Sequence, residues 1–275
     1  MVPKALGGME FLRMSILKDA KKVVIKVGTS TLTHSTGMLN IRRMEELVKV
    51  ISDLKNAGKD IVLVSSGAVG IGVGKLGLAS RPKDTPTKQA CAAIGQCELM
   101  YIYDKYFSKY NHNVAQVLLT RDIIERETRK ENVTNTFNKL LEMSVIPIVN
   151  ENDTVSVEEL ELEFGDNDTL SAIVGELVGA DLLIILSDID GLYDKDPHKN
   201  DDAKLIDVVA EINDDIIALA GGKGSELGTG GMITKIHAAR HCLNAGFPMA
   251  ILNGTNINQL YDLLDGKTVG TIFKA

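Results

Sequence analysis

Two clusters of Asp and Asn side chains are the residues in this chain whose type and spacing could do chemistry. Asn150–Asp153 follows a short apolar, β-like run, and Gly165–Asp168 opens a helix-like run. Asp and Asn are common in turns and at helix N-caps because their short side chains bond the nearby backbone, so either cluster alone could be an ordinary turn. Two such clusters at the ends of adjacent elements in an α/β pattern are more typical of a ligand site.

Two lysines lie where a strand or a glycine-rich stretch meets the next element. Lys26 is near the end of the β-branched run Val23–Val27 and precedes Gly28, although a lysine there could simply extend to solvent. Lys235 lies in the first turns of a helix that follows the glycine-dense stretch 221–231, which could also be a mobile surface loop. Glycine amides that open a helix suit a polyphosphate. Lysines combined with amide donors describe a site for phosphoryl transfer.

Two further strand-like runs deliver small polar residues to loops. Ser65–Ala68 follows a buried-type strand, and more glycines come after it, which makes this stretch a candidate anion cradle or a flexible turn without a ligand. It matches neither the phosphate loop nor the dinucleotide fingerprint, because its glycine spacing begins well past the strand end. Ser187 and Asp188 similarly follow the most apolar run of the chain, Leu182–Leu186.

Strand-like and helix-like segments alternate along the chain, which predicts an α/β fold: a mainly parallel central sheet wrapped by helices, in one domain. Gly95 lies inside a predicted helix, where it allows close packing against another helix, a ligand or a second subunit. The predicted strands are Val23–Val27, Ile61–Val64, Val114–Thr120, Val145–Val149, Leu182–Leu186 and Pro248–Leu252. The predicted helices are Ile41–Ala57, Lys88–Phe107, Asn132–Met143, Leu170–Val178 and Ile236–Ala245, and Leu205–Ala220 reads as a strand-like start followed by a helix.

Composition restricts the class of protein. The chain has 275 residues, of which 44% are hydrophobic and 24% charged, so it can bury a sizeable core. A formal net charge of −7 argues against a nucleic-acid surface. We expect no membrane span and no signal peptide. The three cysteines are expected to be free thiols in a reducing compartment, which indicates a cytoplasmic protein.

Motifs in order along the chain resemble the glutamate 5-kinases of the amino-acid kinase superfamily. The similarity extends from about Lys21 to Phe273, and the most specific motifs are SSGAV, NENDTVS, GDNDTLSA and GTGGMITK, whereas SDIDGLYDKDP is shared across the superfamily. The resemblance implies the three-layer sandwich of the amino-acid kinase fold in residues 21–275, with residues 1–20 as an N-terminal extension. Many members carry a C-terminal PUA domain, which we do not expect in this chain.

The resemblance also implies an activity: ATP- and Mg²⁺-dependent phosphorylation of the γ-carboxylate of L-glutamate to L-glutamyl 5-phosphate, the first step of proline biosynthesis. Lys26, Asp168 and Lys235 would be catalytic, with Asp168 between the two lysines. Glutamate would be bound by Ser66, Asn150, Asp153 and Asn167. ATP would be bound by Lys26, Ser187, Asp188, Thr229, Gly230, Gly231, Met232, Ile233, Thr234 and Lys235. No residue is expected to be a dedicated metal ligand.

This chemistry suits the residue types. A γ-carboxylate with an ordinary pKa near 4.3 is ionised at neutral pH and needs no general base, and none of the five histidines lies in these motifs. The resemblance further implies feedback inhibition by proline and assembly into a homo-oligomer, a dimer or tetramer. The alternatives are another carboxylate or carbamate kinase of the superfamily, or a non-catalytic amino-acid or nucleotide sensor on the same fold.

Overall fold

The computed structural model describes residues 17–34, 38–120, 126–155, 167–197, 199–221 and 231–274. Its centre is an eight-stranded sheet with the strand order β3-β4-β2-β1-β5-β7-β8-β6. Neighbouring strands pair in parallel except β7 and β8, which are antiparallel. The strands are β1 (Lys22–Val27), β2 (Asp60–Ser65), β3 (Val114–Leu119), β4 (Ile146–Glu151), β5 (Leu182–Ser187), β6 (Val208–Val209), β7 (Met249–Asn253) and β8 (Thr271–Phe273).

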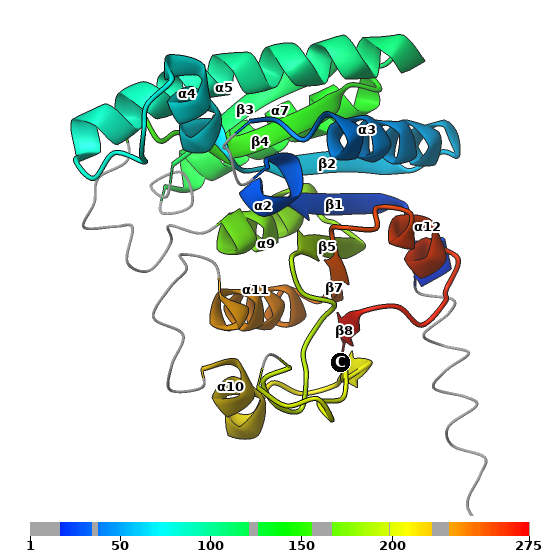
Figure 1. Ribbon diagram of the computed structural model, residues 1–275. Coiled ribbons are helices and arrows are strands. Elements are labelled where there is room, and N and C mark those ends of the chain that lie inside the picture. Colours follow the sequence, from blue (N-terminus) through cyan, green and yellow to red (C-terminus); the bar gives the residue numbers. More distant parts are fainter. Residues whose placement is uncertain are drawn as a thin grey trace, which may run out of the picture.

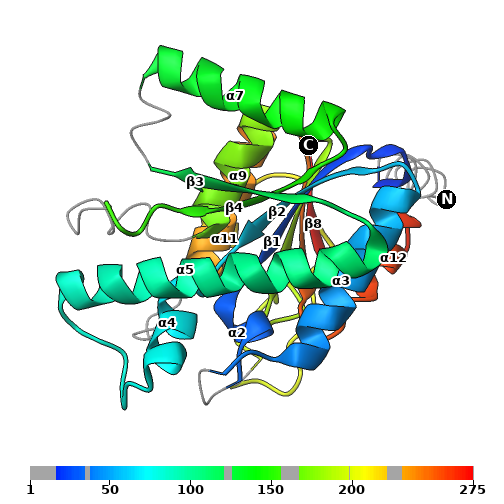
Figure 2. The same cartoon turned by 90° about the horizontal axis from the view of Figure 1, so that it is seen from above.

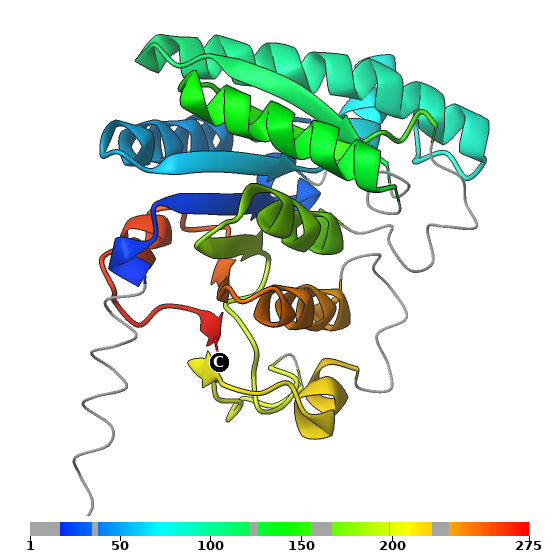
Figure 3. The same ribbon diagram turned by 180° about the vertical axis from the view of Figure 1, so that it is seen from behind.

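Helices cover both faces of this sheet and complete a three-layer sandwich (Figures 1 and 2). On one face lie α2 (Thr29–Leu32), α3 (Ile41–Asn56), α4 (Ala68–Leu76), α5 (Thr85–Phe107) with the short 3-10 helix η1 (Ser108–Tyr110), and α12 (Gln259–Leu264). On the other face lie α7 (Glu127–Glu142), α9 (Asn167–Val178), α10 (Asp214–Ala220) and α11 (Met232–Asn244), which are in front when the molecule is seen from behind (Figure 3).

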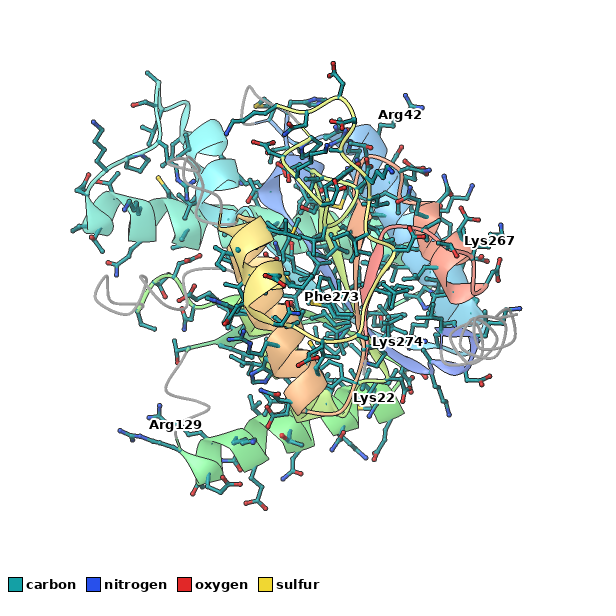
Figure 4. The ribbon with its side chains drawn as sticks, turned by 90° about the horizontal axis from the view of Figure 1, so that it is seen from below. Lys22, Arg42, Arg129, Lys267, Phe273 and Lys274 are labelled. Carbon is teal, nitrogen blue, oxygen red and sulfur yellow. The ribbon has the colours of Figure 1, made fainter. Side chains whose placement is uncertain are left out.

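The β-branched runs form strands that are buried on both faces, as a central parallel sheet requires. Side chains alternate between the faces, so Ile25 of β1 joins the core under α3 and α5 while Val24 joins the core under α9 and α11. Side chains of the last strand, β8, also alternate between the two faces, since Ile272 joins the first core and Phe273 the second. Phe273 of β8 is fully buried in the middle of the molecule, whereas Lys267 projects at its periphery (Figure 4).

The six predicted strands and the predicted α/β class are confirmed. The helix predicted over Lys88–Phe107 begins at Thr85, where the Asp84 side chain accepts a hydrogen bond from the backbone N–H of Thr87. The helix predicted from Asn132 begins at Glu127.

The glycine-rich stretch after Ser66 differs from the expectation of a cradle or flexible turn. Gly70, Gly72 and Gly74 lie inside α4, which packs tightly against α5. A Cβ atom at Gly72 would lie 1.9 Å from the carbonyl oxygen of Cys91, and one at Gly95 would lie 1.8 Å from that of Ala68. Backbone contact between two helices therefore explains these glycines, and of the three possibilities for Gly95 it is the helix contact that the structure shows.

The chain order places a topological switch point at β1. The strands β2 and β4 lie on one side of β1, and β5 and β7 lie on the other. In open α/β sheets ligands bind outside the carboxyl ends of the strands at such a point. The cluster Asn150–Asp153 lies at this edge, and so do Asn167 and Asp168, the described residues of the second cluster. Among the described residues, no helix is long and apolar enough to cross a membrane.

Candidate active site

A buried carboxylate between two buried lysines forms the charged part of the site. Lys26 Nζ lies 2.6 Å from Asp168 Oδ1, and Lys235 Nζ lies 3.0 Å from Asp168 Oδ2. Asp168 is completely buried, and both lysine side chains are more than nine-tenths buried. The Thr234 hydroxyl is a further neighbour, 3.1 Å from Asp168 Oδ2. Asp168 thus lies between the two lysines, and its predicted catalytic role stays a prediction.

Three elements bring these charges together. Lys26 is two residues after Val24 in β1, so it points to the same face of the sheet, toward α9 and α11. Asp168 lies in the first turn of α9, where the positive end of the helix dipole favours a carboxylate. Lys235 lies in the first turns of α11, where that dipole disfavours a cation, so Asp168 offsets the cost of its position.

The group carries two positive charges and one negative charge, and all three are removed from water. Burying charges is costly, and a hydrophobic replacement is often at least as stable. A buried group with a net positive charge at the carboxyl edge of the sheet is therefore better explained by function than by stability. It is suited to stabilise an anion.

A second, uncharged part of the site begins one residue earlier, at Asn167. Its Nδ2 lies 2.7 Å from Ser66 Oγ, 3.0 Å from the carbonyl oxygen of Ser65 and 3.1 Å from Asn150 Oδ1. Three of the four residues predicted to bind the substrate are thus joined through one of them, since Asn167 contacts both Ser66 and Asn150. We call these three residues, together with Gln96 of α5, which is hydrogen-bonded to Asn150, the amide cluster.

The strands set the positions within the amide cluster. Asn150 was expected in a turn, but it is the penultimate residue of β4 and is buried. Asp153, the fourth predicted substrate residue, lies in the turn that follows β4 and is half-buried. Ser66 follows β2, and Gly67 adopts φ +98°, a left-handed conformation that favours glycine, before α4 begins at Ala68.

Apart from Lys26 of β1, the described residues predicted to bind the nucleotide lie on the other side of β1. Ser187 ends β5 and lies 3.2 Å from the carboxylate of Asp188, which is exposed. Gly231 precedes α11, and Met232, Ile233 and Thr234 form its first turn. Thr229 and Gly230 lie outside the described residues.

Two polar residues of α5 that were not predicted reach the site from the face opposite to α9. Gln96 Oε1 accepts a hydrogen bond of 2.9 Å from Asn150 Nδ2, and the Tyr103 hydroxyl lies 2.9 Å from Ser65 Oγ. Burial raises the pKa of Tyr103, and the hydrogen bond with Ser65 lowers it only in part, so this hydroxyl stays protonated. The available signal was the helical period: Gln96 shares a face with Ala92, Leu99 and Tyr103, which are all buried.

The residues present fit a metal ion that arrives on a phosphate ligand. The described residues contain no group of three or more His, Cys, Asp or Glu side chains that could hold an ion by themselves. The carboxylate of Asp168 is engaged by two lysines. Mg²⁺ typically keeps few protein ligands and rides on substrate phosphates, which is consistent with this donor set.

Comparison with known proteins agrees with this geometry. The model of the Amino acid kinase family matches residues 21–253, a range that includes all the predicted site residues. Glutamate 5-kinase from Clostridium perfringens is 57% identical over 94% of this chain and 97% of its own length. Glutamate 5-kinase from Listeria innocua is 54% identical over 94% of both chains. The chain belongs to the amino acid kinase family, and within it to the glutamate 5-kinases.

Solved structures support the amino acid kinase fold. Carbamate kinase from Giardia lamblia, bound to AMP-PNP, has a TM-score of 0.65 and 19% identity, covering 94% of this chain and all of that one. UMP kinase from Bacillus anthracis has a TM-score of 0.62 and 16% identity, and the match covers 93% of this chain and 96% of that one. At these identities the similarity concerns the fold alone.

Proposed function

We propose that this chain transfers the γ-phosphoryl group of ATP to the γ-carboxylate of L-glutamate, giving ADP and L-glutamyl 5-phosphate, the first step of proline biosynthesis. The observation that carries the proposal is the buried Lys26–Asp168–Lys235 group directly beside the amide cluster, in a chain that is more than half identical to named glutamate 5-kinases. When bound, Mg²⁺ supplies charge neutralisation on the nucleotide phosphates.

The residues divide the reaction between them. A γ-carboxylate oxygen attacks the γ-phosphorus, an O–P bond forms, and the bond from the γ-phosphorus to the bridging oxygen of ADP breaks. No proton moves, so no general base is required. Lys26 and Lys235 offset the repulsion between the anionic nucleophile and the triphosphate, and Asp168 holds both ammonium groups in place.

The amino acid is held by Ser66, Asn150 and Asn167, while Asp153 suits its ammonium group because it is a carboxylate at the carboxyl edge of the sheet. ATP lies on the β5 and α11 side, against Ser187, Asp188 and the residues from Gly231 to Lys235 at the start of α11. Thr229 and Gly230, which are also predicted to bind ATP, lie outside the described residues.

Hydroxylamine trapping tests the proposed function, because an acyl phosphate gives a hydroxamate with hydroxylamine. We expect hydroxamate and ADP in equal amounts with L-glutamate, ATP and Mg²⁺, and neither product with L-aspartate or N-acetyl-L-glutamate. If another acid is the preferred acceptor, the substrate assignment is wrong. If no acid in the panel releases ADP, the chain is not a carboxylate kinase.

We also propose that proline inhibits the enzyme at a site that overlaps the glutamate site and that the chain forms a homo-oligomer. If so, proline raises the KM for glutamate and leaves the KM for ATP unchanged. An effect of proline on the KM for ATP alone would contradict the overlap, and a monomer in sedimentation at assay concentration would contradict the oligomer.

A further inference from the structure

Gln96 carries a buried amide group that the fold does not use fully. The residue is 8% exposed and lies on α5, on the face that packs against the sheet. Its Oε1 accepts the hydrogen bond from Asn150 Nδ2. Its Nε2 is buried and has no hydrogen-bond partner among the described residues. Leaving a buried donor unpaired is unfavourable, so a partner from outside the chain is to be expected.

The neighbouring contacts determine which end of each amide faces which partner. Asn150 Oδ1 accepts a hydrogen bond of 2.9 Å from the backbone N–H of Glu151, which can only donate. This fixes Oδ1 as the acceptor of Asn150 and Nδ2 as its donor. Gln96 must then present Oε1 to Asn150. The unpaired group of Gln96 is therefore its NH₂ donor, Nε2. A ligand that pairs with it must carry a hydrogen-bond acceptor.

The position of this donor is fixed by the backbone. The helices α4 and α5 are in backbone contact at Gly72 and Gly95, where a Cβ atom would lie less than 2 Å from a carbonyl oxygen. Gly95 directly precedes Gln96. On the same face, about two turns further along α5, the Tyr103 hydroxyl is hydrogen-bonded to Ser65, the residue before Ser66. The donor of Gln96 is thus held rigidly relative to the substrate residues, as a preorganised binding group should be.

The order of the hydrogen bonds indicates which part of the substrate this donor meets. The γ-carboxylate must reach Lys26 and Lys235, which contact Asp168 at the start of α9. From the adjacent Asn167 the amide cluster runs through Asn150 to Gln96, and Asn150 lies on β4, two strands away from β1, which carries Lys26. If the γ-carboxylate of glutamate is at the lysines, the acceptor group at the other end of the molecule is its α-carboxylate.

We propose that Gln96 Nε2 donates a hydrogen bond to the α-carboxylate of the amino-acid substrate, which makes Gln96 a substrate-binding residue that selects an α-carboxylate. This rests on the proposed function for the identity of the substrate. The competing explanation is that a buried water molecule occupies Nε2 and that Gln96 only supports Asn150.

The test uses two variants and two amino acids. Gln96→Glu keeps an oxygen acceptor for Asn150 but replaces the donor with a carboxylate that repels the α-carboxylate, and Gln96→Met removes both groups. L-isoglutamine carries an amide in place of the α-carboxylate and keeps the γ-carboxylate. Gln116→Glu on β3 adds the same charge at an exposed position and is the control.

Calorimetric titration of the full chain should give a Kd for L-glutamate that rises about 10- to 100-fold in Gln96→Glu, a range expected when a buried hydrogen-bonding partner is lost. The Kd for L-isoglutamine should rise much less or fall, because its amide can donate to the new carboxylate. Gln96→Met should also weaken glutamate binding, and Gln116→Glu should not. A Kd for glutamate within threefold of the unchanged chain in Gln96→Glu, or equal losses for both amino acids, would overturn the proposal.

Turnover separates this inference from the proposed function. If the unchanged chain binds glutamate but releases no ADP, the proposed function fails, and the ratio of the two dissociation constants still decides the role of Gln96. If the chain is active, the KM for glutamate should follow the Kd in Gln96→Glu, and the KM for ATP should stay within about twofold. A KM for ATP that rises in parallel would indicate a structural role and contradict the proposal.

Discussion

Asn167 and Asp168 are adjacent in the chain, yet they belong to two unlike regions of the site. Asp168 joins two lysines on the face of the sheet covered by α9 and α11. Asn167 reaches over the strand ends to Ser66 and Asn150, and α5 supports Asn150 from the opposite face through Gln96. One region is charged and the other is neutral.

This difference matches the two tasks of a kinase. The charged region acts on charge that builds up during phosphoryl transfer, and an interaction realised there raises kcat. The neutral region offers hydrogen bonds that a bound amino acid uses equally before and during the reaction, and such interactions lower KM. Changes in the two regions should therefore separate these two parameters.

The largest effect is expected from Lys235→Met. Loss of one cation should lower kcat by about 10²- to 10⁴-fold. The folded protein should keep its Tm, because Lys26 and Asp168 remain as a neutral pair. Steady-state ADP release and thermal unfolding check both statements, with Lys139→Met on the exposed surface of α7 as the control. A folded Lys235→Met protein with a kcat within a few-fold of the unchanged chain would remove Lys235 from catalysis.

A smaller effect is expected from Gly95→Ala, which tests the support of the neutral region. The added Cβ would lie 1.8 Å from the carbonyl oxygen of Ala68, and overpacking of this kind costs about 1–3 kcal/mol. For a chain of this size the Tm should fall by a few degrees per kcal/mol, roughly 2–12 °C. We also expect a raised KM for glutamate, because Gln96 moves with α5.

Gly70→Ala is the matched control for this stability measurement. It lies in the same helix pair, but the nearest atom to its Cβ would be Thr29 Cγ2 at an ordinary 3.6 Å. In a helix Ala is favoured over Gly by about 1 kcal/mol, so the Tm should hold or rise. Equal losses of Tm in both variants would contradict the close helix contact as the reason for Gly95.

The smallest effect is expected at the surface, where Glu176 of α9 contacts Lys130 of α7 and His241 of α11. Burial raises the pKa of Glu176, but its interactions with Lys130 and His241 outweigh that effect and leave the pKa lowered. A lowered pKa in the folded state contributes stability above the unfolded value near 4.3, and this stability is lost as the pH falls through the folded value.

Glu176→Gln should therefore lower the Tm slightly at pH 7, and by progressively less as the pH falls through the lowered folded-state pKa. Exposed ion pairs contribute at most about 1 kcal/mol, and kcat should not change. Glu142→Gln, which removes a single exposed partner of Lys139, should have a still smaller effect. A difference in Tm that does not shrink as the pH is lowered into the acid range would mean that the charge of Glu176 is not what stabilises these three helices.

Much of the charged region could be predicted from the sequence. Lys26 at a strand end, Asp168 at a helix start and Lys235 after a glycine-rich stretch carry local signals, and strand alternation and the switch-point rule bring them to one edge. The strands were equally predictable, because their β-branched runs leave few alternatives.

The helical period could place Gln96 on the buried face of α5, but its partner could not be predicted, because the contact joins distant segments. Gln96 contacts Asn150, 54 residues away, and a single glutamine in a helix is usually exposed. The helix α4 was missed for a related reason. Its glycines disfavour a helix locally, and only the close contact with α5 compensates for that cost. The helix α12 was not predicted either.

Steady-state kinetics of Asn167→Ala beside Asp168→Asn test the division of the site most directly, since one residue separates the two changes. Asn167→Ala should raise the KM for glutamate about tenfold and leave kcat within a few-fold, because it removes neutral hydrogen bonds.

Asp168→Asn should instead lower kcat by about 10²- to 10³-fold with little change in KM, and it should lower the free energy of unfolding by about 3–5 kcal/mol because two buried lysines lose their counter-charge. If both variants change the same kinetic parameter by similar factors, the two regions act as one and the division is wrong.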